Sequence, residues 1–259
     1  MTVEMSTYVV AEVSQQADLV KTIRLLDVPT AMPGQFFLIW LPGIDEKPIS
    51  VSNQTSAGTE FTICGVGPWS TAMLQVEAGD RVGLRGPFGN GFALADNTLL
   101  VGGGMGVAPL RYLAHRLMEE GRSFDLVVGA RDASSLIFRE EFGRWGARFA
   151  TDNGDLGHVG TVTELLSEML RLRAYDSLYA CGPEGMLAAV RVIADEHEMA
   201  YQLALERLMK CGIGLCGHCC MEGSGLRLCV EGPVLTREML DGTAEFGLPH
   251  RDGSGRRRT

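Results

Sequence analysis

The chain has 259 residues and a formal net charge of −9, which argues against nonspecific nucleic-acid binding, because contacts to phosphate need a basic face. No apolar run approaches the ~18 residues that span a bilayer, and the N-terminus lacks the order of a signal peptide, so we expect a cytoplasmic protein with no membrane contact. Seven cysteines, four of them in a metal-like spacing, fit a reducing compartment better than a disulfide framework.

Short β-branched and aromatic runs, cut by turn residues, fill the first third of the chain. They predict strands near 7–16, 19–27, 36–42, 48–54, 60–67 and 81–87. Strands at such close spacing suggest a small antiparallel barrel. The pattern also allows one short helix near 70–76.

After residue 96 the pattern changes to alternating strands and helices, which implies a parallel sheet covered by helices. The expected strands are 98–101, 124–130, 148–152 and 177–181, and the expected helices are one with apolar residues from 110 to 118 and those at 135–145, 161–172 and 184–197. The sequence therefore predicts a multidomain β and α/β protein. Its expected parts are a barrel at 1–95, a nucleotide-binding domain at 96–200, a cysteine module at 201–245 and a tail at 246–259.

A glycine run follows the first strand of the second domain and precedes its helix. The run contains Gly102, Gly103, Gly104 and Gly106. At this place in dinucleotide folds a pyrophosphate approaches the backbone, and a helix N-terminus supplies N–H donors. The order is not G-x-G-x-x-G, and a tight strand-to-helix turn would explain the glycines nearly as well.

A second candidate for cofactor binding is the turn Cys181-Gly182-Pro183 at the end of a later strand. Ligands of open α/β sheets bind beyond the carboxyl ends of the strands, so we expect this turn and the glycine run to face one crevice. Cys181 would then touch a nicotinamide. The alternative is a buried thiol at the end of a strand.

Two stretches of the barrel half carry the residue types of a phosphate or flavin site. Lys47, Pro48, Ile49 and Ser50 open a strand with a cation, a proline and a hydroxyl. Residues 65–70 are either a phosphate-accepting loop at the start of a helix or simply a turn. For the first stretch the alternative is an ordinary edge strand.

The cysteines Cys211, Cys216, Cys219 and Cys229 have the spacing C-x4-C-x2-C-x9-C, whose first three members match plant-type [2Fe-2S] ligands. Interspersed glycines free the backbone to curl round a cluster. A structural zinc site would also take four thiolates but usually pairs them as knuckles, and free cysteines are a third reading. Cys220 would then not be a metal ligand.

Barrel, nucleotide fold and cysteine loop together describe an electron path. A nicotinamide passes two electrons at once, whereas a [2Fe-2S] cluster takes one. A flavin can accept two electrons at once and pass them on singly, so it can link the two.

Motifs along nearly the whole chain resemble those of class B dihydroorotate dehydrogenase electron-transfer subunits, in the ferredoxin reductase superfamily. These motifs are K-P-I-S at 47–50, G-P-F-G-N-G-F at 86–92, L-L-V-G-G-G-M-G-V-A-P-L at 99–110, T-D-N-G-D-L-G-H-V-G-T-V-T at 151–163, C-G-P at 181–183 and the C-terminal cysteine segment. The resemblance implies FAD on the barrel, NAD(H) on the nucleotide fold and one [2Fe-2S] cluster on the cysteines.

The resemblance also assigns residues and a partner. FAD would be held by Lys47, Pro48, Ile49, Ser50, Thr62, Ile63, Cys64, Trp69 and Ser70. The cluster would take Cys211, Cys216, Cys219 and Cys229. The partner would be a catalytic, FMN-containing dihydroorotate dehydrogenase subunit, in a heterotetramer of two copies of each subunit.

Two residues depart from the family's pattern. Lys47 stands where the family usually has arginine, and Trp69 replaces a usual glycine in the phosphate loop. Sulfhydrogenase γ subunits and anaerobic sulfite reductase B subunits share similar cysteine loops and are the alternative. A zinc-stabilised interaction module is a hypothesis of another class. The choice between NADH and NADPH is open, with Arg131 placed to meet a 2′-phosphate or to cap a turn.

Overall fold

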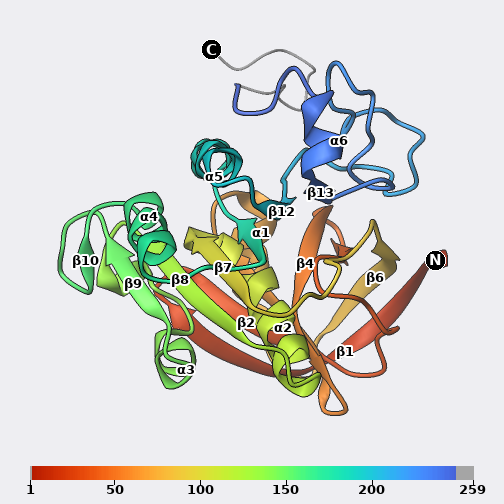
Figure 1. Ribbon diagram of the computed structural model, residues 1–259. Coiled ribbons are helices and arrows are strands. Elements are labelled where there is room, and N and C mark those ends of the chain that lie inside the picture. The colour runs from red at the N-terminus through yellow and green to blue at the C-terminus, as the bar shows by residue number, and fades with distance from the viewer. Residues whose placement is uncertain (1, 249–259) are drawn as a thin grey trace.

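Six antiparallel strands close into a barrel in the computed structural model, which describes residues 2–248 (Figure 1). They pair in the order β1-β2-β5-β4-β3-β6. The strands are β1 (Thr2–Ala17), β2 (Val20–Leu25), β3 (Phe36–Leu41), β4 (Asp45–Thr55), β5 (Gly58–Cys64) and β6 (Arg81–Phe88). The predicted strands are therefore confirmed, and the expected short helix is α1 (Pro68–Met73), where a proline suits the first turn.

Side chains alternate between the inside and the outside of the barrel, as the pleat of a strand requires. Phe37, Ile39 and Phe61 fill the interior and are almost fully buried. On the outer face, Thr22, Thr62 and Ser52 form a chain of hydroxyl contacts of 2.9 and 3.0 Å across three strands. That outer face is buried as well, so it is covered by other parts of the molecule.

The second sheet has the order β10-β9-β8-β7-β11-β12-β13. Its parallel strands are β7 (Thr98–Gly103), β8 (Phe124–Ala130), β9 (Arg148–Thr151), β10 (His158–Val159), β11 (Ser177–Cys181) and β12 (Ala200–Ala204), and β13 (Val234–Thr236) is antiparallel. From β7 the chain first builds outward through β8, β9 and β10, and then returns to the other side of β7 with β11. The strand order therefore reverses between β7 and β11.

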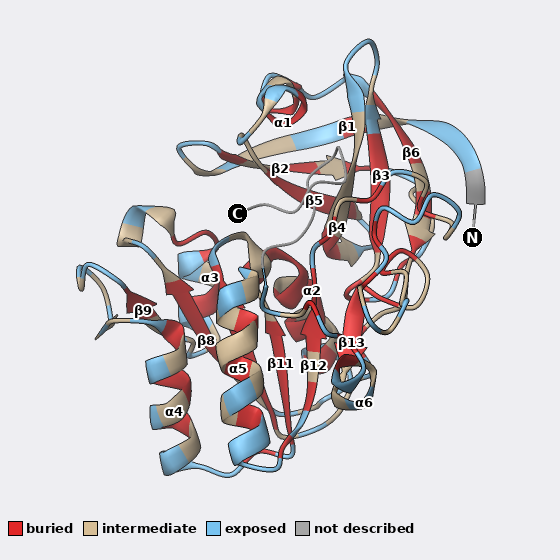
Figure 2. Cartoon of the chain, turned by 90° about the horizontal axis from the view of Figure 1, so that it is seen from above, coloured by how far each residue is buried: buried red, intermediate tan, exposed pale blue. Residues whose placement is uncertain are grey.

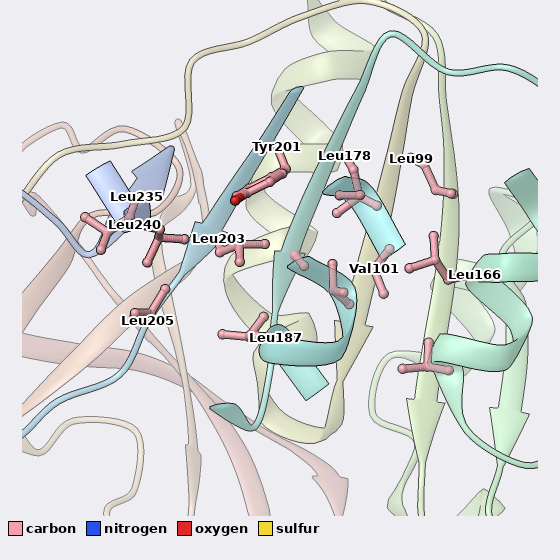
Figure 3. Packing of buried hydrophobic residues seen from close by; sticks show 14 of the residues in the cluster. Leu99, Val101, Leu166, Leu178, Leu187, Tyr201, Leu203, Leu205, Leu235 and Leu240 are labelled. Atoms are coloured by element: carbon pink, nitrogen blue, oxygen red, sulfur yellow. The ribbon is translucent and has the colours of Figure 1, made fainter. Parts of the chain in front are cut away.

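Helices cover both faces of this sheet. The helices are α2 (Val107–Glu119), α3 (Arg139–Arg144), α4 (Val162–Leu172) and α5 (Glu184–Glu196). Leu99 and Val101 of β7 pack with Leu166 of α4 and Leu187 of α5 in one core (Figure 3). Leu100 belongs to a second core with residues of α2 and α3. The predicted helix-covered parallel sheet is confirmed.

Several elements differ from the sequence prediction. The helix expected at 135–145 starts only at Arg139, because a short 3-10 turn precedes it, in which the carboxylate of Asp132 accepts the N–H of Ser135 at 2.9 Å. The strands β10, β12 and β13 and the helix α6 (Arg237–Asp241) were not predicted. They are short, and their sequences carry little periodicity.

The cysteine segment joins the two larger parts of the molecule. Cys219 and Cys229 share a buried core with Leu38 and Phe88 of the barrel and with Leu203 of the sheet. Figure 2 shows exposed residues along the outward faces of α4 and α5, with the buried strands behind them. Among the described residues no helix is long and apolar enough to cross a membrane. The basic residues Arg256, Arg257 and Arg258 and most of the expected tail lie outside the described residues.

Candidate functional site: a crevice with glycine, flavin and cysteine segments

The glycine run and the Cys181 turn lie side by side at the point where the strand order reverses. Gly102 of β7 and Cys181 of β11 are partners in the parallel ladder. Ligands of open α/β sheets bind at such a reversal. The structure thus brings together the two stretches that we expect to face one crevice. A separate cavity of about 250 Å³ near Asp125 and Arg173 lies at the amino ends of the strands, opposite the carboxyl ends that carry these motifs.

Most of the glycines serve close packing, and only one opens outward. A β-carbon on Gly102 would stand 2.6 Å from Val107 of α2, and one on Gly103 would stand 2.4 Å from Met186 and 3.2 Å from Pro183. Gly104 is exposed, has φ of +53° and has nothing within 4 Å of its β position. The backbone at Gly104 is therefore the part of the run that a phosphate can approach.

Cys181 is half-buried at the carboxyl end of β11. Burial, followed by the nearby Glu206 carboxylate, raises the pKa of its thiol to about 12. The thiol is thus neutral at physiological pH. A neutral thiol is a poor nucleophile, because the thiolate is the reactive form.

The strand direction divides the predicted flavin residues into two groups. Ile49 and Ile63 point into the barrel, where Ile63 is 2% exposed, so they can reach a flavin only through their backbone. Pro48 and Ser50 alternate with them and point outward. Cys64, the ladder partner of Val20, packs against a core cluster that contains Val20 of the barrel and residues of the nucleotide domain.

Lys47 forms an ion pair with Asp45 two residues earlier, and its side chain is 40% exposed. The hydrogen bond from Lys47, together with the N–H of Glu46, lowers the pKa of the Asp45 carboxyl. The ammonium group therefore has a carboxylate partner already, and a flavin phosphate would compete with Asp45 for it.

Trp69 and Ser70 use their side chains within the protein. Trp69 is 3% exposed in the barrel core, and its Nε1 has no hydrogen-bond partner among the described residues. The hydroxyl of Ser70 accepts the N–H groups of Val66 and Gly67 at 2.9 and 3.0 Å. Only the backbone of these two residues remains to contact a ligand. The FAD-binding role that the resemblance implies for Trp69 and Ser70 is therefore limited to backbone contacts.

The four candidate ligands come together as two pairs of thiols. Cys211 contacts Cys216, and Cys219 contacts Cys229. Backbone N–H groups also point at sulfur, from Cys216 to Cys211 at 3.4 Å and from Gly214 to Cys229 at 3.2 Å. Gly214 has φ of +77°, which lets the loop turn its amides inward.

This paired arrangement provides four thiol donors in two sets of two. Among residues 2–248 no group of three or more histidine, cysteine or acidic side chains stands close enough together to hold one metal ion. A [2Fe-2S] cluster needs two thiolates on each of its irons, which is what two pairs offer. We refer to residues 211–229 as the cysteine loop.

The two pairs differ in their surroundings. Burial works against ionisation of Cys211 and Cys216, but backbone N–H groups outweigh it and lower the pKa of both thiols. Burial, with the adjacent Cys219, raises the pKa of Cys229 to about 12. Cys220 points away, with its sulfur 3.3 Å from the carbonyl oxygen of Gly225.

The cysteine loop lies directly on the barrel. A β-carbon on Gly212 would stand 3.0 Å from both Leu38 and Phe88. Leu38 is the ladder partner of Pro48 in the predicted flavin stretch. Since neighbouring strands are ~4.8 Å apart, the loop lies about one strand away from residues 47–50.

Asn90 and Arg207 hold the chain on either side of the cysteine loop in place. The sequence analysis assigned no role to either residue. The amide of Asn90 donates to the carbonyl oxygens of Glu231 and Val234 at 2.9 and 2.7 Å and accepts the N–H of Val234 at 3.0 Å. Arg207, 4% exposed, forms ion pairs with Glu184 at the start of α5 and with Glu245. Asn90 lies within a family-like motif, which was the available signal.

An ion-pair network fixes the barrel against the nucleotide domain. Glu60 of β5 contacts Arg24 at 2.8 Å and Arg111 of α2 at 2.5 Å, and Arg111 contacts Glu141 of α3 at 2.6 Å. The four side chains are at most 32% exposed. Arg131, by contrast, is 81% exposed and pairs with Asp132 at 3.2 Å.

Comparisons with known proteins agree with this arrangement. Residues 206–241 match the iron-sulfur cluster binding domain of dihydroorotate dehydrogenase B, and residues 100–192 match the oxidoreductase NAD-binding domain. The chain is 36% identical over 250 residues to the probable dihydroorotate dehydrogenase B (NAD(+)) electron transfer subunit of Methanocaldococcus jannaschii, covering 96% of both chains. It is 40% identical to the corresponding subunit of Methanothermobacter thermautotrophicus, covering 87% of this chain and 85% of that one.

Solved structures give the same picture. A chain of the NADH-dependent reduced ferredoxin-NADP oxidoreductase, studied for flavin-based electron bifurcation, superposes with a TM-score of 0.81 at 27% identity, covering 93% of this chain and 94% of that one. The Amycolatopsis cytochrome P450 reductase superposes with a TM-score of 0.62 at 24% identity, covering 74% and 66%. The second likeness concerns the fold alone.

Proposed function

Because the chain belongs to the family of dihydroorotate dehydrogenase B electron-transfer subunits, we propose that it transfers electrons to NAD+ in pyrimidine biosynthesis. The electrons would come from a catalytic subunit that oxidises dihydroorotate. The observation that carries the proposal is the contact of the cysteine loop with Leu38, one strand away from residues 47–50. It brings the predicted cluster and flavin segments together on one face of the barrel.

The residues present fit the three cofactors of such a subunit: FAD, a [2Fe-2S] cluster and NAD(H). The thiol pairs Cys211 with Cys216 and Cys219 with Cys229 would hold the cluster. The outward-facing Pro48 and Ser50, with the backbone of residues 62–64, would hold FAD. A bound flavin exchanges a hydride for single electrons, which no amino-acid side chain here can do.

The nicotinamide nucleotide would bind at the reversal of strand order. The exposed backbone at Gly104 would meet its pyrophosphate, and Gly106 and residues 181–183 would line the same crevice. The neutral thiol of Cys181 would lie against the ring. The names of the relatives, which specify NAD(+), support NADH as the co-substrate.

The catalytic partner would dock at the outer edge of the cysteine loop. Leu215 is 80% exposed and its neighbour Cys216 is exposed too, whereas Cys219 and Cys229 are buried. An exposed apolar side chain beside a ligand suits a protein contact. We propose an FMN-containing partner in a heterotetramer of two copies of each subunit, working in the cytoplasm without nucleic acid or membrane.

Co-expression with the dihydroorotate-oxidising barrel enzyme of the same genome tests this proposal. We expect the two chains to co-purify and to reduce NAD+ when dihydroorotate is added, whereas this chain alone oxidises NADH only with an artificial acceptor. Co-purification with a nickel hydrogenase or a sirohaem protein would overturn it in favour of a sulfhydrogenase γ or sulfite reductase B role. Zinc without iron or acid-labile sulfide would favour a structural interaction module.

A further inference from the structure

Arg85 of β6 makes contacts that reach both the barrel and the cysteine loop. Its guanidinium forms a two-point ion pair with the carboxylate of Glu46, with Nε and Nη2 at 2.6 and 2.7 Å from the two oxygens. It also donates to the carbonyl oxygen of Cys211 at 2.9 Å and to that of Lys210 at 3.1 Å. These hydrogen bonds join β6 to two distant parts of the chain, Glu46 in β4 and residues 210–211 in the cysteine segment.

The two partners of Arg85, Glu46 and Cys211, adjoin the predicted flavin site and the predicted cluster site. Glu46 directly precedes residues 47–50 of the predicted flavin stretch. Cys211 is the first of the four predicted cluster ligands, 126 residues beyond Arg85. The side chains of Arg85 and Glu46 are 17% and 21% exposed, so solvent screens the pair only in part.

An ordinary barrel ion pair would explain Glu46 but not the carbonyl contacts. Arginine has five N–H donors in a rigid fork, so it can satisfy a carboxylate and two carbonyl groups at once, which lysine cannot do. Asn90 binds the chain just beyond Cys229, at the other end of the cysteine loop. The barrel therefore holds the cysteine loop at both ends. Arg85 is the residue that binds the backbone of a predicted cluster ligand, Cys211.

We propose that Arg85 is a positioning residue for electron transfer, which holds the backbone of Cys211 at a fixed place beside the flavin stretch. This inference rests on the proposed function as far as the cluster and FAD are concerned. It does not depend on which catalytic partner the protein has. A cluster held by Cys211 would lie near this guanidinium, whose positive charge would favour the reduced, more negative state of the cluster.

The test uses the full chain with its cofactors, in the variants Arg85→Gln and Arg85→Lys. For Arg85→Gln we expect a changed EPR spectrum of the reduced cluster and a lower midpoint potential. We also expect NADH to reduce the cluster more slowly relative to the flavin in the same sample, because electron transfer slows as the distance between the two groups grows. Arg85→Lys keeps the charge and should restore the potential but not the rate.

The matched control is Arg173→Gln, which removes an arginine paired with Asp125 at 2.9 Å on the far edge of the sheet. It should leave spectrum, potential and rate unchanged. If Arg85→Gln fails to fold, Glu46→Gln releases the barrel end of the contact and should slow reduction of the cluster by a smaller factor, while the loss of the negative charge should raise the midpoint potential. Loss of the cluster with full retention of flavin in Arg85→Gln would also support the inference.

Two results would overturn it. One is an Arg85→Gln protein with the spectrum, potential and relative rate of the wild type. The other is an equal loss of flavin and cluster, which would mean a general structural role. A wild-type protein with neither iron nor flavin would instead reject the proposed function, and this inference with it, so the two failures are distinguishable.

Discussion

The α-carbon of Gly106 lies against the backbone of Cys181: a β-carbon on Gly106 would stand 2.3 Å from both the carbonyl carbon and the carbonyl oxygen of Cys181. The two residues come from the turns that end β7 and β11. Gly106 itself has φ of −63° and ψ of −13°, which any residue adopts. Space, and not backbone conformation, therefore requires glycine here.

Gly106→Ala should push the two turns apart. We expect a loss of about 1–3 kcal/mol in unfolding free energy, as for other overpacked sites. NADH binding should weaken by about tenfold, equivalent to ~1.4 kcal/mol, measured by titrating the flavin reduction rate against NADH. Gly143→Ala is the control, since its β position on α3 is open and alanine favours a helix. Unchanged NADH affinity in Gly106→Ala would contradict our placement of the nucleotide.

Serine in place of any of the four candidate ligands should remove the cluster, whereas Cys220→Ser should keep it. The sulfur of Cys220 faces the carbonyl of Gly225, and a serine hydroxyl can donate to the same oxygen. Iron and acid-labile sulfide analysis, with EPR after dithionite reduction, checks this. A cluster that survives Cys216→Ser but not Cys220→Ser would show that the exposed ligand is misassigned.

Asn90→Ala should loosen the far end of the cysteine loop. The change leaves the carbonyls of Glu231 and Val234 and the N–H of Val234 without their amide partner, and Val234 is 2% exposed. We expect a loss of roughly 3 kcal/mol in urea unfolding, because each unsatisfied group costs about 1–3 kcal/mol and water relieves part of it. Asn153→Ala, on an exposed loop, should change stability by less than about 0.5 kcal/mol. Equal effects of the two substitutions would refute the role of Asn90.

The ion pairs of Glu60 predict how stability depends on pH. Burial alone would raise the pKa of Glu60, but the guanidinium groups of Arg111 and Arg24 outweigh it and lower the pKa below its usual range. A carboxyl whose pKa is lower in the folded state stabilises the fold above the unfolded pKa of about 4.3, and this contribution is lost as the pH falls through the folded value.

We therefore expect the unfolding free energy to fall as the pH drops below about 5, and to fall less steeply in Glu60→Gln. At neutral pH the same variant should be less stable by about 1–3 kcal/mol, because Arg111 and Arg24 each lose one charged hydrogen-bond partner while keeping Glu141 and Glu12. Urea titrations between neutral and acidic pH measure both effects. Glu140→Gln, exposed on α3, is the matched control, and an identical acid slope in Glu60→Gln and wild type would exclude the linkage.

Much of the fold could be predicted because its signals are local. The barrel strands and the longer helices carry their own periodicity, and turn residues mark their ends. The strands β12 and β13 are short, and β13 is a strand only because Leu235 finds Leu203 as its partner in the sheet. Such pairing depends on contacts that no short window of sequence contains.

The sequence by itself determined the cysteine spacing, the order of the three parts and the two turns at the crevice, since each is a pattern among near neighbours in the chain. Only the tertiary structure decided that Ile49 and Ile63 face the barrel interior, that the thiols stand in two pairs, and that Arg85 reaches Cys211 across 126 residues. The physical reason is that the direction of a side chain and the partner it meets are set by which surfaces pack together, and packing joins residues that are far apart in the sequence.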